Sequence, residues 1–467
     1  MTTKQRWVLA LTSAASFMIA LDTTVVTTAL STIRRDLGAS VETLEWVVNA
    51  YVLTFAVLLL TGAALGDRFG RRRMFVAGLA TFTVASAACA LAPTIGLMIA
   101  ARAVQGVGAA LVLPLAITQL SAAFSAEQRG KALGIWSGIT GLATFGGPFI
   151  GGAVAQGLAW QWIFWINVPV GLLAVAFTFL RINESRGPNR GLDAGGVVLA
   201  IGGSLGLVWG LVRGNAAGWG SLEVVASLTV GVVLVVAFVG WEIRSLTPML
   251  PMRFFAVRGF SSANAANFAM IAGMYATLFF LAQYFQTAQG DGPLLAGLRI
   301  MPWTGTLMVC GPVAGRLADR FGERGPLLAG LLLQAIGSGW LALIISPDLG
   351  YGWMLPPMIL AGCGISIAMP AAQKAVVGAV RLEEIGPASG GFSMLRQLGG
   401  MFGIAIAVAV FAAVGSYASP HDFSGGFAAV LTAVTLFAVI GAACAAALPG
   451  RSRTAPAVSA PTVSVAR

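Results

Sequence analysis

The chain has 467 residues, of which 57% are hydrophobic and only 10% charged, and its mean hydropathy is +0.86. No water-soluble fold can bury so large an apolar fraction, so the composition indicates a polytopic membrane protein. The formal net charge of +11 invites a nucleic-acid-binding interpretation, but the distribution of the basic residues excludes it.

Fourteen apolar segments, each long enough to cross the hydrocarbon core as a helix of about 20 residues, are separated by charged or Pro/Gly-rich breaks. We therefore expect an all-α polytopic membrane protein, and no remaining segment is long enough for a soluble domain. The predicted spans are 8–29, 45–66, 74–92, 95–118, 131–155, 161–181, 193–212, 222–241, 261–286, 294–317, 326–346, 353–374, 389–415 and 424–448.

The basic residues follow the topology of such a protein. With the N-terminus in the cytoplasm, 22 of the 28 Lys and Arg residues fall in internal loops, in the tails or at the internal ends of spans. Three are external, and the remaining three, Arg102, Arg299 and Arg396, lie farther inside spans. This positive-inside pattern predicts a multi-pass protein of the cell inner (plasma) membrane with both termini cytoplasmic. Its partner is then the lipid bilayer and not nucleic acid, because no large basic surface remains.

The first predicted span contains the clearest candidate for a functional group. Lys4 and Arg6 precede an apolar run that passes Asp22 without a small-residue cleavage site, which indicates a retained helix and not a signal peptide. Asp22 is the only carboxylate that we place deep in a span. Ionisable groups at that depth are costly and are by default proton or substrate sites. The alternative is a carboxylate that only hydrogen-bonds to neighbouring helices.

A charged turn occurs twice, about 250 residues apart, and each copy ends a predicted helix. The first copy is Leu-Gly-Asp-Arg-Phe-Gly-Arg-Arg-Arg at 65–73, and the second is Leu-Ala-Asp-Arg-Phe-Gly-Glu-Arg at 317–324. In register with them, the Gly-x-Gly and Pro spacing of 106–114 recurs at 362–370. Such repeats predict duplicated bundles around a midplane site, which is how secondary transporters are built.

The acidic residue of each charged turn is the part that topology does not require, because the positive-inside rule explains the arginines alone. One interpretation is an inner gate, in which Asp67 pairs with an Arg or meets the positive end of a helix near Ser389. The other is a solvated basic loop, and for Asp319 neither is favoured. The residues assigned to this gating motif are Asp67, Arg68, Gly70, Arg71, Arg72, Asp319 and Arg320.

Arg102, in the fourth span, lies at about the depth of Asp22 when helix rise is counted at roughly 1.5 Å per residue. A carboxylate and a guanidinium at equal depth can pair in one state and separate in another, which makes a protonation-sensitive contact. Gln105, one turn away, would share this network. The alternative is a purely structural ion pair.

The fifth span carries a run of small residues with one proline. Gly147, Gly151 and Gly152 permit close backbone contact, and Pro148 adds a bend. Helix packing explains these residues without any functional role.

The offset between the repeats divides the chain unevenly. Residues 1–182 hold the first six spans, and 259–450 hold the last six. A polar linker and two additional spans occupy 183–258, and the tail at 451–467 is predicted to be disordered. The two additional spans have few polar residues, which suits an insert that faces lipid.

Four of these motifs resemble those of the major facilitator superfamily, specifically its fourteen-helix drug:proton antiporter branch. They are Leu-Asp-Thr-Thr-Val-Val at 21–26, the charged turn at 65–73, Arg-Ala-Val-Gln-Gly-Val-Gly-Ala at 102–109 and Gly-Pro-Phe-Ile-Gly-Gly at 147–152. The resemblance covers essentially everything except the tail. Ala63 and Ala143 stand where the family motifs usually have Gly, and both keep close helix approach possible.

The resemblance implies a major facilitator fold of two six-helix bundles with two extra transmembrane helices between them. It also implies a proton-relay role for Arg102, control of conformational change by the charged turn, and a leak-proof contact between the bundles at the antiporter motif of span five. Spans that line the cavity in this fold carry polar or aromatic residues suited to bulky hydrophobic compounds. These are Asn49, Asn264, Asn267, Tyr275, Gln283, Gln286, Trp303 and Gln397.

Each cavity residue taken alone is more often a helix–helix contact than a ligand contact. Two arginines within spans, Arg299 and Arg396, suit an anionic group of a substrate. Alternatively, both lie near helix ends and extend their charged groups to the membrane interface.

No cofactor and no metal site is expected. The four cysteines are scattered in apolar segments, and the single histidine, His421, falls in a predicted external loop. The sequence has no Walker loop, so ATP-driven transport is excluded and an ion gradient must supply the energy. Protons suit a single buried carboxylate better than sodium does.

The sequence therefore predicts a proton-coupled exporter (antiporter) of drugs or other hydrophobic small molecules, working by alternating access as a monomer. A proton from outside would bind Asp22, and its release to the cytoplasm would restore affinity for substrate. One alternative is a dedicated exporter of a single natural product or metabolite, which the sequence does not separate from multidrug export. A membrane-embedded lipid-modifying enzyme is disfavoured, because it needs a cluster of catalytic groups near one interface.

Overall fold

The structure is a computed structural model that describes residues 1–186, 193–381 and 384–449. Within these ranges the side chains at 41–42, 126–127, 129–131, 311–312, 315–316, 319 and 386 are also outside the description. The predicted disordered tail at 451–467 and part of the predicted linker therefore lie outside the described residues.

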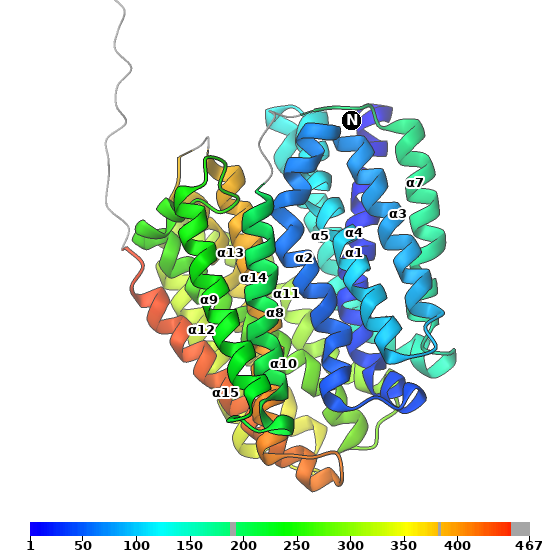
Figure 1. Cartoon of the computed structure of the whole chain (residues 1–467), viewed down its shortest axis with the longest axis vertical. Helices are drawn as coiled ribbons and strands as arrows, with labels where there is room; N and C mark the ends of the chain where they lie inside the picture. Colours follow the sequence, from blue (N-terminus) through cyan, green and yellow to red (C-terminus); the bar gives the residue numbers. More distant parts are fainter. Residues whose placement is uncertain (187–192, 382–383, 450–467) are drawn as a thin grey trace, which may run out of the picture.

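Every regular element in the described ranges is a helix, and Figure 1 shows the long ones running side by side. Thirteen described segments are long and apolar enough to cross a membrane, and α11 is a further long helix. The predicted all-α polytopic fold is thus confirmed. The elements are α1 (Thr3–Leu37), α2 (Val41–Phe69), α3 (Arg71–Ala90), α4 (Ile95–Ala123), α5 (Ala126–Gly157), α6 (Trp162–Trp165), α7 (Asn167–Arg181), α8 (Ala194–Ala217), α9 (Leu222–Arg244), η1 (Met252–Ala256), α10 (Arg258–Thr287), α11 (Pro293–Phe321), α12 (Arg324–Ile344), α13 (Tyr351–Gly378), α14 (Ile385–Val414) and α15 (Pro420–Ala446).

The long helices form two groups, with α1–α7 on one side of Figure 1 and α10–α15 on the other. In the first group α4 packs against α2 and α3, and α1 packs against α5. In the second, α13 packs against α11 and α12, and α10 packs against α14 and α15. The groups meet mainly through α5 with α11 and α2 with α14. We call them the first and second bundle.

The sequence repeat reappears as a repeat in packing. Gly106 of α4 fits against the backbone of α2, and Gly108 fits against the backbone of α3. In the second bundle, Gly362 of α13 fits against the backbone of α11, and Gly364 against α12. At each of these positions an added Cβ would collide with main-chain atoms, which cannot move aside as a flexible side chain can. The helix trio α2, α4, α3 therefore corresponds to α11, α13, α12.

The two charged turns also share a backbone conformation. Gly70 has φ of 110° and Gly322 has φ of 79°, values that L-residues with a Cβ rarely adopt. Gly70 immediately precedes α3, and Gly322 follows the last residue of α11. Glycine at these positions is thus required by the sharp change of direction at the end of each helix.

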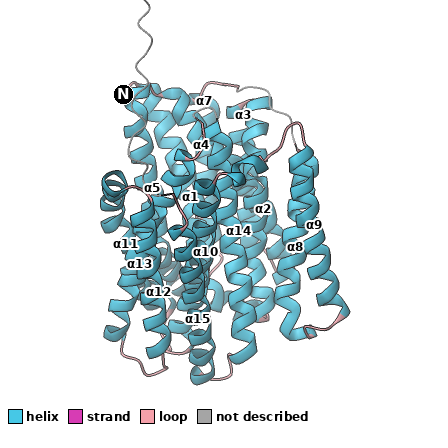
Figure 2. Ribbon diagram, turned by 90° about the vertical axis from the view of Figure 1, so that its left-hand side faces the viewer, coloured by secondary structure: helices cyan, strands magenta, loops and turns pink. Residues whose placement is uncertain are grey.

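The two additional helices, α8 and α9, pack chiefly against each other through close contacts at Gly203, Gly206 and Gly231. Figure 2 shows them at one edge of the molecule. α9 is the outer helix, and its apolar residues are largely exposed, as the sequence predicts for an insert facing lipid. α8 differs from that expectation, because it also contacts α2 and α14, one helix from each bundle.

Candidate functional site

Asp22 lies on α1 among the helices of the first bundle, and only 2% of its surface is exposed. One carboxylate oxygen, Oδ2, accepts a hydrogen bond from the guanidinium of Arg102 on α4 and forms an ion pair with it. The other oxygen, Oδ1, accepts from Nε2 of Gln105 at 2.9 Å and from Nδ2 of Asn167 at 3.2 Å. The structure thus brings together all three residues predicted for proton coupling.

Arg102 is held in one orientation by contacts on several sides. Its Nε donates to the carbonyl oxygen of Val47 on α2 at 2.9 Å, and its NH1 donates to Oε1 of Gln105 at 2.8 Å. Its Cζ lies 4.2 Å from the ring centre of Tyr51, a cation–π contact that suits a desolvated guanidinium. The charge is thus bound to helices α1, α2 and α4 together.

Sequence reasoning missed two members of this network. Asn167, at the start of α7, donates to Asp22 and also to Oγ of Ser86 at 3.0 Å. Ser86 on α3 donates in turn to the carbonyl oxygen of Phe164 at 3.0 Å. Both residues are almost fully buried. The available signal was an isolated amide and an isolated hydroxyl within apolar spans, which is common and therefore weak.

The network can act as a charge-balance switch. A buried ion pair is tolerated because each charge offsets the other. If one charge is lost, the second stays buried without a partner, and its desolvation then costs much free energy. Protonation of Asp22 would remove the negative charge that balances Arg102 and would favour separation of α1 from α4.

Asp22 is not the only buried carboxylate, because Glu45 on α2 and Glu242 on α9 are also almost fully buried. Both lie within a few residues of a helix end, so Asp22 keeps the deepest position along its helix of the three. The Oε2 of Glu242 accepts from the backbone N–H of Leu250 at 3.0 Å and thereby ties the end of α9 to the segment that leads into α10.

The acidic residue of the first charged turn pairs with an arginine of the same turn, within the first bundle. Arg71 donates to Oδ1 of Asp67 through Nε at 2.9 Å and through NH2 at 2.7 Å. Of the two gate contacts considered from the sequence, the described structure therefore contains the pairing with an Arg and records none with Ser389. The side chain of Asp319, the corresponding acid of the second turn, lies outside the described residues.

The other members of the charged turn contact the linker or neighbouring rings. Glu184 accepts from the backbone N–H groups of Arg72 at 2.9 Å and Arg73 at 3.2 Å, so it caps the start of α3. Sequence reasoning missed this role of Glu184. The guanidinium of Arg68 lies over the ring of Phe69, and that of Arg320 lies over the ring of Phe321 in the same way.

We expect Asp67→Asn to reduce transport far more than stability. The Asp67–Arg71 pair is partly exposed, with 15% and 18% of the two side chains accessible, so its loss should change the free energy of unfolding by at most about 1 kcal/mol. If the pair controls the conformational step, the export rate should fall by about tenfold. Thermal unfolding and vesicle transport of the same preparation check this, and parallel losses in both would identify a merely structural pair.

The glycines of α5 face two different partners. Gly147 and Gly151 fit against Thr24 and Val25 on α1, within the first bundle. Gly152 instead fits against the carbonyl group of Pro293 on α11, and Gly297 of α11 fits against the backbone of Pro148. The motif therefore joins α5 closely to helices of both bundles.

Polar contacts between the bundles gather at the end of the molecule opposite the N-terminus. Gln286 of α10 donates to the carbonyl oxygen of Thr28 on α1 at 3.0 Å. Gln156 of α5 accepts from the backbone N–H of Leu294 on α11 at 3.0 Å. Arg34, near the end of α1, lies 3.9 Å over the ring centre of Tyr417. These contacts seal the bundles together at this end.

The predicted cavity residues separate into two kinds. Gln283 and Gln286 are engaged, the former accepting from the hydroxyl of Tyr417 and the latter joining the bundles. Asn49 on α2 and Asn267 on α10 are fully buried. In both residues the amide nitrogen and the amide oxygen lack a hydrogen-bond partner within the described part of the chain. Unpartnered amides of this kind suit groups that change partners between states or that receive a ligand.

The remaining cavity residues lie at different places in the second bundle. Asn264 donates to the carbonyl oxygen of Phe260 on its own helix at 2.9 Å, while Gln397 is buried on α14. The ring of Tyr275 packs against α14 at Gly400 and is partly accessible.

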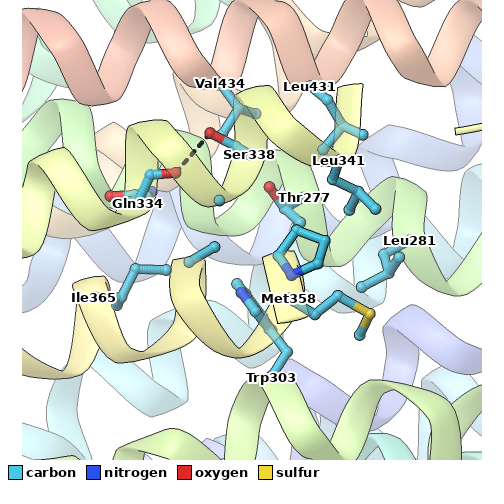
Figure 3. Close-up of a pocket in the computed structure, with 13 residues that line it drawn as sticks. Thr277, Leu281, Trp303, Gln334, Ser338, Leu341, Met358, Ile365, Leu431 and Val434 are labelled. Atoms are coloured by element: carbon cyan, nitrogen blue, oxygen red, sulfur yellow. Dashed lines mark hydrogen bonds between the residues drawn. The ribbon is translucent and has the colours of Figure 1, made fainter. Parts of the chain in front are cut away.

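Trp303 points into a small pocket inside the second bundle, beside Thr277, Ser338 and Met358 (Figure 3). The volume of the pocket is about 10 Å³, which is the size of a single water site, so it does not hold an organic substrate.

The chain is similar to known proteins over most of its length. The family model of the Major Facilitator Superfamily matches residues 12–404. A tetracenomycin C resistance and export protein of Streptomyces glaucescens is 36% identical over 83% of this chain and 72% of its own length. Multidrug resistance protein Stp of Mycobacterium tuberculosis (strain CDC 1551 / Oshkosh) is 34% identical over 87% of this chain and 76% of its own. A crystal structure of a bacterial homologue of the human lysosomal transporter Spinster shares the fold with a TM-score of 0.70 at 15% identity, covering 95% of this chain and 97% of that one.

Proposed function

Because this chain belongs to the Major Facilitator Superfamily, we propose that it is a proton-coupled antiporter of the fourteen-helix branch that exports hydrophobic small molecules. It is a membrane transporter, not an enzyme, and it is related to drug and antibiotic exporters. The observation that carries proton coupling is the buried Asp22–Arg102 pair, whose carboxylate accepts from three side chains.

In the proposed cycle, the conformation described here binds substrate with Asp22 ionised and paired to Arg102. The bundles are sealed at the end opposite the N-terminus, and with a cytoplasmic N-terminus this is the outer end. Proton binding to Asp22 would weaken the pair, and α1 would then be free to move relative to α4. Exchange of a proton for a substrate follows if the two occupants favour opposite states.

Export of one dedicated compound is the second candidate. The relative named for tetracenomycin C export favours it, because that name specifies a single compound. The name of the other relative specifies multidrug resistance and favours broad export. Both candidates use the same coupling site, so they differ only in the residues that contact the substrate.

Inverted membrane vesicles that contain the protein will test the function with ethidium as the substrate. Vesicles energised to an acid interior should accumulate ethidium, and a protonophore should release it, because the proton gradient supplies the energy. Vesicles from cells that lack the protein are the control. Accumulation that persists with the protonophore would contradict proton coupling, whereas absence of accumulation would favour a dedicated substrate.

A further inference from the structure

Arg396 lies well inside a transmembrane helix. It is twelfth of the 30 residues of α14, and it lies about 16 Å along the helix axis from Ile385, where the helix begins. The expectation that it sits near a helix end and extends to the membrane interface is therefore wrong, because the hydrocarbon core is about 30 Å thick. A cation at this depth needs a partner or a water-filled surrounding.

Arg299, the other arginine considered for an anionic group, has such a partner. It lies in the second turn of α11, and its NH1 forms an ion pair with Oδ2 of Asp291 at 2.5 Å. It also donates to Oε1 of Gln289 at 2.7 Å. Its charge is therefore neutralised locally at the end of the molecule opposite the N-terminus.

Arg396 differs, because no carboxylate pairs with it in the ranges that the structure describes. Its Nε is buried without a hydrogen-bond acceptor. The side chain is surrounded by protein yet partly accessible, so an incoming group can reach it. Its charge is thus available to an incoming group.

Tyr275 on α10 shares this environment. It is also surrounded by protein and partly accessible, and it interacts electrostatically with Arg396. The ring of Tyr275 packs against Gly400 of α14, one turn beyond Arg396, so the two helices hold the two side chains close together. A phenolic hydroxyl beside a guanidinium offers two kinds of donor to one anion, and the ring offers an apolar surface.

We propose that Arg396, assisted by Tyr275, binds an acidic group of the exported compound, so that the substrates include amphipathic molecules with a carboxylate or an ionised phenol. This inference rests on the proposed export function and specifies its substrate class. A guanidinium binds a planar carboxylate through two parallel hydrogen bonds, and a dry surrounding strengthens this attraction. The same charge disfavours cations at this position.

Two dyes with the same xanthene skeleton and opposite charge will test this inference, namely fluorescein as the anion and rhodamine 6G as the cation. Binding is measured by fluorescence anisotropy with the purified full-length protein in detergent. Arg396→Gln should raise the Kd of fluorescein at least about tenfold, which corresponds to roughly 1.4 kcal/mol, and should leave the Kd of rhodamine 6G within twofold or lower it. The Kd of fluorescein for Arg396→Lys should lie between the values for wild type and Arg396→Gln. Tyr275→Phe should weaken fluorescein binding severalfold.

Arg299→Gln is the matched control, because it removes an equal charge from another helix of the second bundle, where Asp291 already pairs with that charge, and it should leave the Kd values of both dyes within twofold. The inference would be overturned if Arg396→Gln weakened the binding of both dyes equally. It would also be overturned if the wild-type protein bound only rhodamine 6G, or bound neither dye. Proton-driven export of ethidium in vesicles would stand in that case, since binding in detergent involves no gradient. Conversely, selective loss of fluorescein binding would stand even if transport proved independent of protons.

Discussion

Asp22→Asn is expected to abolish proton-driven export while the protein remains in the membrane. Asparagine has nearly the same shape, and its carbonyl oxygen can still accept from Gln105 and Asn167. It cannot take up and release a proton, and its amide would face the guanidinium of Arg102, donor against donor. The proton gradient would then have no group through which to bias the conformational equilibrium.

The same substitution should also lower stability, because it leaves the charge of Arg102 buried without compensation. The expected loss is about 3–5 kcal/mol in the free energy of unfolding. Combining Asp22→Asn with Arg102→Gln removes both charges and should recover most of that stability. The double variant therefore separates the two effects, since it should be stable and still inactive in proton-driven export.

Thermal unfolding in detergent and ethidium accumulation in energised vesicles are measured for wild type and for both variants. Asp22→Asn alone should have the lowest Tm, and neither variant should accumulate ethidium above the level of vesicles without the protein. Unimpaired, protonophore-sensitive accumulation in the double variant would place proton coupling elsewhere in the chain. A double variant that is no more stable than Asp22→Asn would contradict the charge-balance argument.

Gly152→Ala is expected to reduce export by about tenfold or more, by preventing the closed contact between α5 and α11. The added Cβ would collide with the carbonyl group of Pro293, and main-chain atoms on both helices leave no flexible group to move aside. The collision occurs only where the bundles are sealed together, so the conformation closed at this end should become less populated.

The matched control is Gly138→Ala on the same helix, because an added Cβ at Gly138 meets no atom within 4 Å. Alanine there should leave export unchanged and stabilise the helix by roughly 0.5–1 kcal/mol. Export is measured in vesicles. Closure is measured by reaction of a membrane-impermeant maleimide with a cysteine introduced at Ala296, which is fully buried on α11 next to Gly297. Gly152→Ala should increase that reaction, whereas normal export with unchanged labelling would show that the contact is not required.

Many features of the fold and site were predictable from the sequence, for reasons that concern the backbone and the membrane. Segments of about 20 apolar residues predict spanning helices, because the hydrocarbon core offers no partners to unpaired backbone groups. The repeated glycines of the fourth and twelfth spans reflect close helix packing, and the charged turns require glycine at positive φ. Asp22 was identifiable because a carboxylate deep in a span is rare.

The tertiary structure decided which polar groups meet. Asn167 and Ser86 join Asp22 only because α3 and α7 pack side by side, a relation between distant segments that no local pattern encodes. Arg299 and Arg396 were equivalent in the sequence as two arginines in spans. The fold separates them, because Asp291 lies within reach of the first and no described carboxylate pairs with the second.

The sequence alone therefore determined the membrane class, the repeated architecture and the rare intramembrane charges, since each follows from local composition and spacing. Only the tertiary structure decided which charge is balanced and which remains available, because the free energy of a buried charge depends on the partners that packing brings within a few ångströms of it.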